Sequence, residues 1–262
     1  MKDVSIFAML LLSCMLGAAT FDEVYAKGIA EIRKGNFEQA RSLFQEAETI
    51  AADPTQKTNA VLQQSLTMMN TPADSLKLLT TYRENVGALP TNLAAALALR
   101  IGECAYRCQR YDEARQSLES ALAAKKLSSR DQSLAYKTLS NTLIRLKDYD
   151  QADKTAELWK DLADISADDY ASALLLQGTC VLLAKPDGDP MKFCDDALQL
   201  KNLSAPMIAT IYQQKAYFLL ALKRPQEALK AVEASAAVAG RGWGYNKELH
   251  DRIIAECQKS EK

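Results

Sequence analysis

The side chain best suited to acid–base chemistry in this 262-residue chain is its single histidine, His250. Any histidine-based dyad or triad would have to use it, and no obvious serine or cysteine partner stands near it in the sequence. The motifs GxSxG, HExxH and GxxxxGK do not occur. The run GRGWG at 240–244 follows no predicted strand, which favours a flexible joint over a phosphate loop. We therefore predict a non-enzymatic protein with no catalytic residue and no cofactor.

Metal binding is the second chemistry to consider. The motif PDGD at 186–189 resembles the start of a calcium loop, but no glutamate follows at the required offset. A zinc site would need clustered histidines or paired CxxC motifs, and the chain has neither. PDGD is therefore interpreted as a turn, and no metal site is predicted.

The chain has six cysteines, of which five follow position 20. Cys104 and Cys108 lie one turn apart on one predicted helix, so a bond between them would constrain little. Cys180 and Cys194 lie on two paired helices but about 9 Å apart along the axis, and a disulfide requires Cα atoms within about 7 Å. We expect these four, and Cys257, to be small buried apolar residues.

The first nineteen residues have the order of a secretory signal, with a positive start, a short apolar core and small residues. Cleavage near Ala19 would release a soluble periplasmic or secreted protein, which is the interpretation that we favour. The segment LLSC, ending at Cys14, also resembles a bacterial lipobox, which would anchor the protein to the outer membrane through lipid on that cysteine. A buried, uncleaved first helix is the third interpretation.

The composition excludes some partners and favours one fold class. With 32 Lys and Arg against 33 Asp and Glu, the formal net charge is −1. This balance argues against broad electrostatic capture of nucleic acid or anionic lipid. No segment alternates between apolar and polar residues for long enough to indicate a half-buried strand. The chain is predicted to be all-α.

Small residues recur at a fixed interval along the chain. Six positions, 35 to 39 residues apart, begin similar apolar stripes: Ala40, Ser75, Ala114, Ala152, Pro190 and Ala228. Twelve residues before them lie Gly28, Gln63, Gly102, Ser140, Gly178 and Ala216, of which five are small. Such a period indicates stacked helical hairpins. Glycine costs about 1 kcal/mol in a helix, so Gly28 and Ala40 are predicted to mark the contact between two paired helices.

The repeated segments resemble the tetratricopeptide repeat (TPR) family, and IGECAYRCQRYDEARQSLESA at 101–121 matches its pattern closely. The resemblance covers about residues 21–237. It implies a right-handed superhelical solenoid of about six helix–turn–helix hairpins, occupying residues 20–239. The repeat is longer than the usual length of about 34 residues.

A different segment, 240–262, follows the sixth hairpin. The run from Gly240 to Gly244 is predicted to break the helix, and Asn246 to cap a final one. Leu249, Ile253 and Cys257 form an apolar stripe on that helix. This profile is typical of a capping helix that closes a solenoid.

The resemblance also implies a binding surface, because the first helix of each TPR hairpin lines a concave groove. The groove positions that we select for partner binding are Leu99, Glu103, Tyr106, Lys137, Asn141, Ile144, Leu175, Thr179, Gln213 and Tyr217. The same register includes Lys57, Ala60, Gln64, Thr67, Leu182 and Leu220. Each apolar position could equally pack between neighbouring helices. Lys137 and Asn141 coincide with carboxylate-gripping residues of chaperone-associated relatives, but the following hairpins supply no further basic residue, so a full clamp is not predicted.

We predict a non-catalytic scaffold that binds a peptide segment or helix of a partner protein, in a bacterial envelope complex. A carbohydrate- or small-molecule-binding protein that uses the same groove is the alternative, in which Tyr106 and Tyr217 would dominate. Self-association is a further hypothesis, since the first helix presents several apolar residues on one face: Phe21, Tyr25, Ile29 and Ile32.

Overall fold

The computed structural model describes residues 19–260 except for 186 and 244–245. Within these residues the regular structure consists of thirteen α-helices, so the prediction of an all-α chain with six hairpins and a final helix is confirmed. The chain divides into two compact units, one ending at Gln109 and one beginning at Arg110. The predicted signal segment and Cys14 lie outside the described residues. No helix of the described part is long and apolar enough to span a bilayer.

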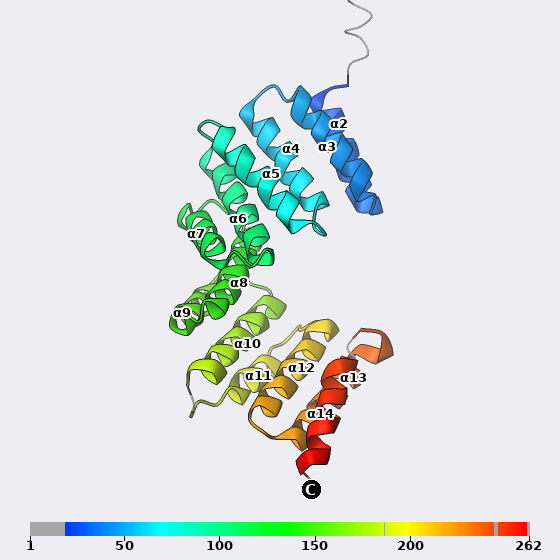
Figure 1. The fold of residues 1–262 in the computed structure, drawn as a ribbon, viewed down its shortest axis with the longest axis vertical. Coiled ribbons are helices and arrows are strands. Elements are labelled where there is room, and N and C mark those ends of the chain that lie inside the picture. Colours follow the sequence, from blue (N-terminus) through cyan, green and yellow to red (C-terminus); the bar gives the residue numbers. More distant parts are fainter. Residues whose placement is uncertain (1–18, 186, 244–245, 261–262) are drawn as a thin grey trace, which may run out of the picture. The chain divides into compact units, whose positions relative to one another are not determined.

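The N-terminal unit contains five helices, labelled in Figure 1: α2 (Phe21–Lys34), α3 (Phe37–Ile50), α4 (Pro54–Thr67), α5 (Pro72–Asn85) and α6 (Thr91–Arg107). Each helix contacts the next one along the chain, and α4 also contacts α2 and α6. The starts of the helices follow ordinary capping chemistry. Thr20 and Glu23 form a capping box at α2, and Asp53 caps α4 ahead of Pro54.

The C-terminal unit contains eight helices: α7 (Tyr111–Ala123), α8 (Ser129–Arg145), α9 (Tyr149–Lys160), α10 (Ala167–Ala184), α11 (Met191–Leu198), α12 (Ala205–Ala221), α13 (Pro225–Trp243) and α14 (Lys247–Ser260). Serine caps begin three of its long helices, at Ser128, Ser166 and Ser204. Helices α8 and α10 each contact their hairpin partner, α9 and α11 respectively, and the first helix of the next hairpin, since α8 contacts α10 and α10 contacts α12.

The turn inside several hairpins uses a left-handed residue. Gly35 has φ of 81°, and Lys147 and Lys223 have φ of 62° and 59° at the corresponding positions. The next backbone N–H then donates to a carbonyl five residues back, as Asp148 does to Leu143 at 2.9 Å. This bond is the Schellman closure of a helix end. The turn geometry is therefore shared, although glycine supplies it only at Gly35.

The predicted close contact at Gly28 is confirmed, with a different partner. Gly28 is buried, and a Cβ added to it would lie 2.7 Å from Cε1 of Phe44 on α3. The small residue therefore accommodates the ring of Phe44 rather than the side chain of Ala40, although Ala40 is also fully buried. Tyr25 packs edge-on against the same ring, with the centroids 5.4 Å apart. Tyr25 and Phe21 thus pack on the core cluster formed by Val24, Ala47 and Ala60.

The corresponding glycine in the fifth hairpin, Gly178, also lies close to aromatic side chains. A Cβ at Gly178 would lie 2.9 Å from the ring of Phe218 on α12 and 3.2 Å from Cβ of Phe193 on α11. Gly178 therefore accommodates side chains both of its hairpin partner α11 and of the following hairpin. Pro190 occupies the N-cap position of α11 without a side-chain capping bond, and the large ring comes from the following hairpin.

The C-terminal end differs from the prediction in one respect. The helical backbone of α13 continues through Gly240 to Trp243, so the predicted break does not begin at Gly240. The predicted N-cap is confirmed, because Asn246 Oδ1 accepts a hydrogen bond from the N–H of Leu249 at 3.0 Å. Leu249, Ile253 and Cys257 are buried in one cluster with residues of α12 and α13. Figure 1 shows α14 lying along α13.

Candidate partner-binding surface

Part of the predicted groove set comes together in the C-terminal unit, on the first helices α8, α10 and α12. We call Lys137, Asn141, Thr179, Gln214 and Tyr217 the first-helix surface. Lys137 and Tyr217 are exposed, and the other three are half-buried. Because α10 contacts both α8 and α12, these residues belong to neighbouring first helices rather than to separate parts of the unit.

Hydrogen bonds fix several polar groups of this surface. Gln214 Nε2 on α12 donates to Thr179 Oγ1 on α10 at 3.4 Å, which joins two first helices. Thr179 Oγ1 itself donates to the backbone carbonyl of Leu175 at 2.9 Å. Asn141 Nδ2 donates to the carbonyl of Lys137 at 2.9 Å. Their remaining acceptor and donor sites can bind the main chain of a ligand.

Tyr217 is the aromatic side chain of this surface. It is 41% exposed, and its hydroxyl accepts a hydrogen bond from Asn246 Nδ2 at 3.3 Å. Since Asn246 also caps α14, the position of the phenol is linked to the start of the last helix. An aromatic ring that is exposed but held at its polar end loses little conformational freedom on contact with a partner.

Several predicted groove residues are instead core residues. Leu99 is 1% exposed and Leu175 is 7% exposed, so both pack between helices, which was the alternative open for each apolar groove position. Ala60, Gln64 and Thr67 on α4 are also buried. The reason is packing from several sides, because α6 packs against α4 and α5, and α10 packs against α8, α9, α11 and α12. Gln64 satisfies its amide internally, with Nε2 donating to Glu48 Oε2 at 2.8 Å.

The remaining predicted residues occupy intermediate positions. Ile144 and Gln213 are half-buried on α8 and α12, and Glu103 and Tyr106 are half-buried on α6. Leu182 and Leu220 are half-buried, and Lys57 is exposed. Because Glu103 and Tyr106 belong to the N-terminal unit, they form a candidate surface of their own.

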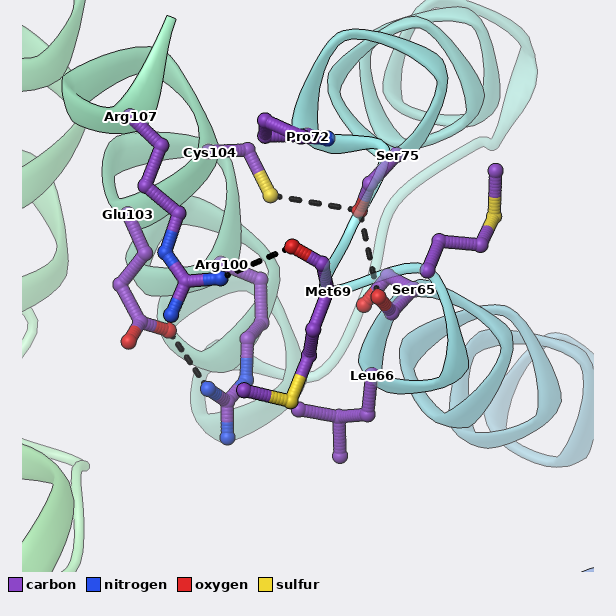
Figure 2. Close-up of a pocket in the computed structure, with 10 residues that line it drawn as sticks. Ser65, Leu66, Met69, Pro72, Ser75, Arg100, Glu103, Cys104 and Arg107 are labelled. Atoms are coloured by element: carbon purple, nitrogen blue, oxygen red, sulfur yellow. Dashed lines mark hydrogen bonds and ion pairs between the residues drawn. The ribbon is translucent and has the colours of Figure 1, made fainter. Parts of the chain in front are cut away.

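Of these two residues, Glu103 lines a small cleft of about 90 Å³ between α4, α5 and α6 (Figure 2). Glu103 Oε2 lies 2.5 Å from Arg100 Nη1 in an ion pair. Arg107 Nη1 donates to the backbone carbonyl of Met69 at 3.3 Å, and Met69 is 54% exposed. The cleft therefore offers a methionine side chain next to two guanidinium groups, whose donors are partly satisfied within the protein.

Three of the described thiols have a raised pKa and therefore little nucleophilic character. Burial raises the pKa of Cys180 and of Cys194 to about 12, so both stay protonated at neutral pH. Burial also raises the pKa of Cys104, whose Sγ lies 3.2 Å from Ser75 Oγ. The expectation of buried cysteines holds for Cys180, Cys194 and Cys257, whereas Cys104 and Cys108 are half-buried.

Other chemistry finds little support in the described part of the chain. No group of three or more His, Cys, Asp or Glu side chains is arranged there to hold a metal ion. His250 is half-buried on α14, with Nδ1 3.6 Å from Asp251 Oδ1.

Sequence reasoning missed three residues that bear on the C-terminal surface. Leu183 near the end of α10 is 50% exposed. Gln214 and Asn246 provide the hydrogen bonds that join α10 to α12 and α12 to the start of α14. Asn246 was predicted as a cap, but its second contact, with Tyr217, depends on tertiary packing that no local sequence signal carries.

Solved structures of TPR proteins share this fold. One chain of the Cut9–Hcn1 hetero-tetramer of the APC/C aligns over 90% of this chain and 43% of its own length at 17% identity, with a TM-score of 0.63. PilF of Pseudomonas aeruginosa aligns over 90% of this chain and 97% of its own at 16% identity, with a TM-score of 0.62. YrrB, a TPR protein with an unusual peptide-binding site, aligns over 81% of this chain and 97% of its own at 15% identity, with a TM-score of 0.52.

The sequence itself matches no family model and no curated protein. The chain spans less than half the length of the Cut9–Hcn1 chain that it matches. At these identities the likeness concerns the fold alone. The protein therefore has a TPR-like repeat fold.

Proposed function

We propose that this protein is a non-catalytic TPR-like scaffold that binds a peptide segment or helix of a partner protein on its first-helix surface. The observation that carries the proposal is Tyr217, an exposed ring whose hydroxyl is fixed by Asn246. Exposed aromatic side chains held in place are frequent anchors of protein interfaces. The fold supports it as well, because YrrB, which has a similar fold, is described as having a peptide-binding site.

The polar residues of the surface suit an extended segment. Asn141, Thr179 and Gln214 present amide and hydroxyl groups along neighbouring helices. Such groups can pair with backbone N–H and C=O groups irrespective of the partner's side chains, which fixes register. Ile144 and Leu183 add apolar contact area on α8 and α10. Affinity would come from the ring and the aliphatic groups, and orientation from the polar groups.

We place this scaffold in a bacterial envelope complex, after export directed by the segment 1–19. The support is the order of that segment, in which Lys2 precedes an apolar run and small residues. Lipidation at Cys14 remains the alternative mode of attachment. Mass spectrometry of the N-terminus of the mature protein decides between a start near Thr20 and a lipidated Cys14.

The binding proposal is tested by affinity capture of the tagged chain from the envelope of its source cells. Wild type is compared with Tyr217→Ala and with Leu158→Ala, a matched removal of an exposed apolar side chain on the second helix α9, where Leu158 is 55% exposed. We expect specific proteins that are retained by Leu158→Ala and lost from Tyr217→Ala. A partner that Tyr217→Ala retains in full, or no specific partner of wild type, would contradict the proposal.

A further inference from the structure

The C-terminal unit contains a second concavity at the end of the first-helix series. It has a volume of about 340 Å³ and lies where the end of α12, the start of α13 and the segment 252–259 of α14 meet. Its lining residues are Leu220, Lys223, Pro225, Arg252, Glu256 and Lys259, which we call the end pocket. Figure 1 shows α12, α13 and α14 together at this end of the unit.

The end pocket combines an apolar part with a basic rim. Leu220 is half-buried and Pro225 is buried, so the apolar contribution is partly covered by the fold. Lys223, Arg252 and Lys259 are exposed. Leu222, which is 37% exposed, adjoins Lys223 in the chain. A cavity with this lining suits an aliphatic side chain whose neighbouring residues in the bound segment are acidic.

The positive charge of the rim is only partly balanced within the protein. Glu256 is occupied by Lys259, with Oε1 2.8 Å from Nζ. Glu227, two residues beyond Pro225, is held by Arg224 through two hydrogen bonds of 2.7 and 2.6 Å. Among the described residues, neither Lys223 nor Arg252 forms an ion pair with a carboxylate. Hydrogen bonding and charge from Lys259, with a smaller contribution from Arg252, lower the pKa of Glu256. The three cations of the rim therefore face one carboxylate, which leaves an excess of positive charge at the edge of one cavity.

The backbone of the turn that carries Lys223 is well defined. Lys223 has φ of 59°, and its N–H donates to the carbonyl of Leu220 at 3.1 Å. Arg224 N–H donates to the carbonyl of Leu219 at 2.9 Å. The turn is thus closed by two hydrogen bonds.

We propose that the end pocket binds an acidic segment of the partner protein, with an aliphatic side chain in the cavity and flanking carboxylates on Lys223 and Arg252. This inference rests on the proposed function and names the chemistry of the bound segment. A concave site with an apolar part favours a peptide over a membrane, which would need a broad basic face. The formal net charge of −1 agrees with a local rather than a general attraction for anions.

The test uses fluorescence polarisation of a labelled peptide, GSEDLEDLG, with the full mature chain. Its neutral counterpart GSQNLQNLG should bind about tenfold more weakly or worse, because charge-assisted hydrogen bonds are lost. GSEDGEDGG, which keeps the charges and lacks the leucines, should also bind more weakly. Raising the salt concentration to about 0.5 M should weaken the binding of the acidic peptide and leave the binding of the neutral peptide unchanged.

The variants localise the binding. The double variant Lys223→Glu/Arg252→Glu should raise the dissociation constant of GSEDLEDLG by about tenfold or more. Lys154→Glu/Lys192→Glu, the same change of charge at two exposed lysines on α9 and α11, should leave the dissociation constant within about twofold of wild type. If circular dichroism shows that the reversed-charge variant is not folded, Lys223→Gln/Arg252→Gln replaces it. This variant should also bind GSEDLEDLG more weakly than wild type.

Two outcomes overturn the inference. One is equal binding of acidic and neutral peptides, or equal loss in both double variants. The other is binding of vesicles that contain phosphatidylglycerol without binding of the peptide, which would make the basic rim a lipid site. Capture of no partner in the envelope experiment, with intact peptide binding at the pocket, would contradict the proposed function and leave the pocket standing.

Discussion

Two buried cysteine thiols have pKa values that make the stability of the C-terminal unit depend on alkaline pH. Cys180 and Cys194 are 3% and 0% exposed, and burial raises both pKa values from 9.0 to about 12. Between these values the unfolded chain loses the thiol protons and the folded chain keeps them. Folding stability is therefore fully present below about pH 9 and declines as the pH rises toward 12.

The check is urea denaturation of wild type and of Cys180→Ala/Cys194→Ala at neutral pH and at two values above pH 9. We expect the free energy of unfolding of wild type to fall more steeply with pH than that of the variant. The variant should be less stable at neutral pH, because it loses two buried sulfur atoms. Parallel pH profiles for the two proteins would show that the thiols do not cause the decline.

At the scale of elements, the turns between paired helices contain residues in an unfavourable conformation. Lys147 has φ of 62° between α8 and α9, where glycine would have no Cβ penalty. We predict that Lys147→Gly raises the free energy of unfolding by about 0.5–1 kcal/mol, after allowing for the greater freedom of glycine in the unfolded chain. Thermal or urea denaturation measures the change.

A matched control uses the same substitution in a regular helix. Lys154→Gly, at an exposed position inside α9, should lower the free energy of unfolding by about 1 kcal/mol. If both substitutions destabilise the protein, the left-handed position is not under conformational strain. The opposite signs are expected because Gly35 already occupies the same position of the first hairpin, with φ of 81°.

The elements were largely predictable from the sequence, and the burial of single groove positions was not. The small residues at Gly28 and Gly178 indicated close helix contacts because a helix tolerates glycine where a neighbour needs the space. The partners of these glycines depend on tertiary packing, which supplied the rings of Phe44 and Phe218. Leu99 and Leu175 have the same periodicity as surface positions, but packing from several sides buries them.

The end of α13 shows the same limit. Gly240 and Gly242 lower the intrinsic helix propensity by about 1 kcal/mol each, which led to the predicted break. The helix nevertheless continues to Trp243, because α13 packs against α12 and α14. Asn246 was predictable because its cap is local, with Oδ1 3.0 Å from the N–H of Leu249. The basic lining of the end pocket comes from two separate segments, so no local pattern indicated it.

At the scale of the whole molecule, the helices contact mainly their neighbours in sequence. Helix α2 contacts α3 and α4, whereas α9 contacts α8 and α10. In such arrays stability is approximately a sum of local terms, and parts of the chain can open separately. Hydrogen exchange measured on peptides from α2–α3 and from α8–α9 can therefore follow two local stabilities in one sample.

Gly28→Ala is the variant that tests this behaviour. Its methyl group would lie 2.7 Å from the buried ring of Phe44, and the resulting overpacking costs about 1–3 kcal/mol against a gain in helix propensity of about 1 kcal/mol. We expect the local stability of α2–α3 to fall by about 1 kcal/mol, which corresponds to an increase of about fivefold in its hydrogen-exchange rate. Peptides from α8–α9 should be unchanged. Gly87→Ala, where no atom lies within 4 Å of the added Cβ, is the neutral control.

The reciprocal variant is Ser133→Ala. Trp159 is fully buried, and its Nε1–H donates to Ser133 Oγ at 2.6 Å, which ties α9 to α8. Without the hydroxyl, the indole N–H has no acceptor, at a cost of about 1–3 kcal/mol. Exchange should then rise in α8–α9 and stay constant in α2–α3. If either variant accelerates exchange equally in both segments, the chain opens as one cooperative body, and nearest-neighbour stability is the wrong description of this protein.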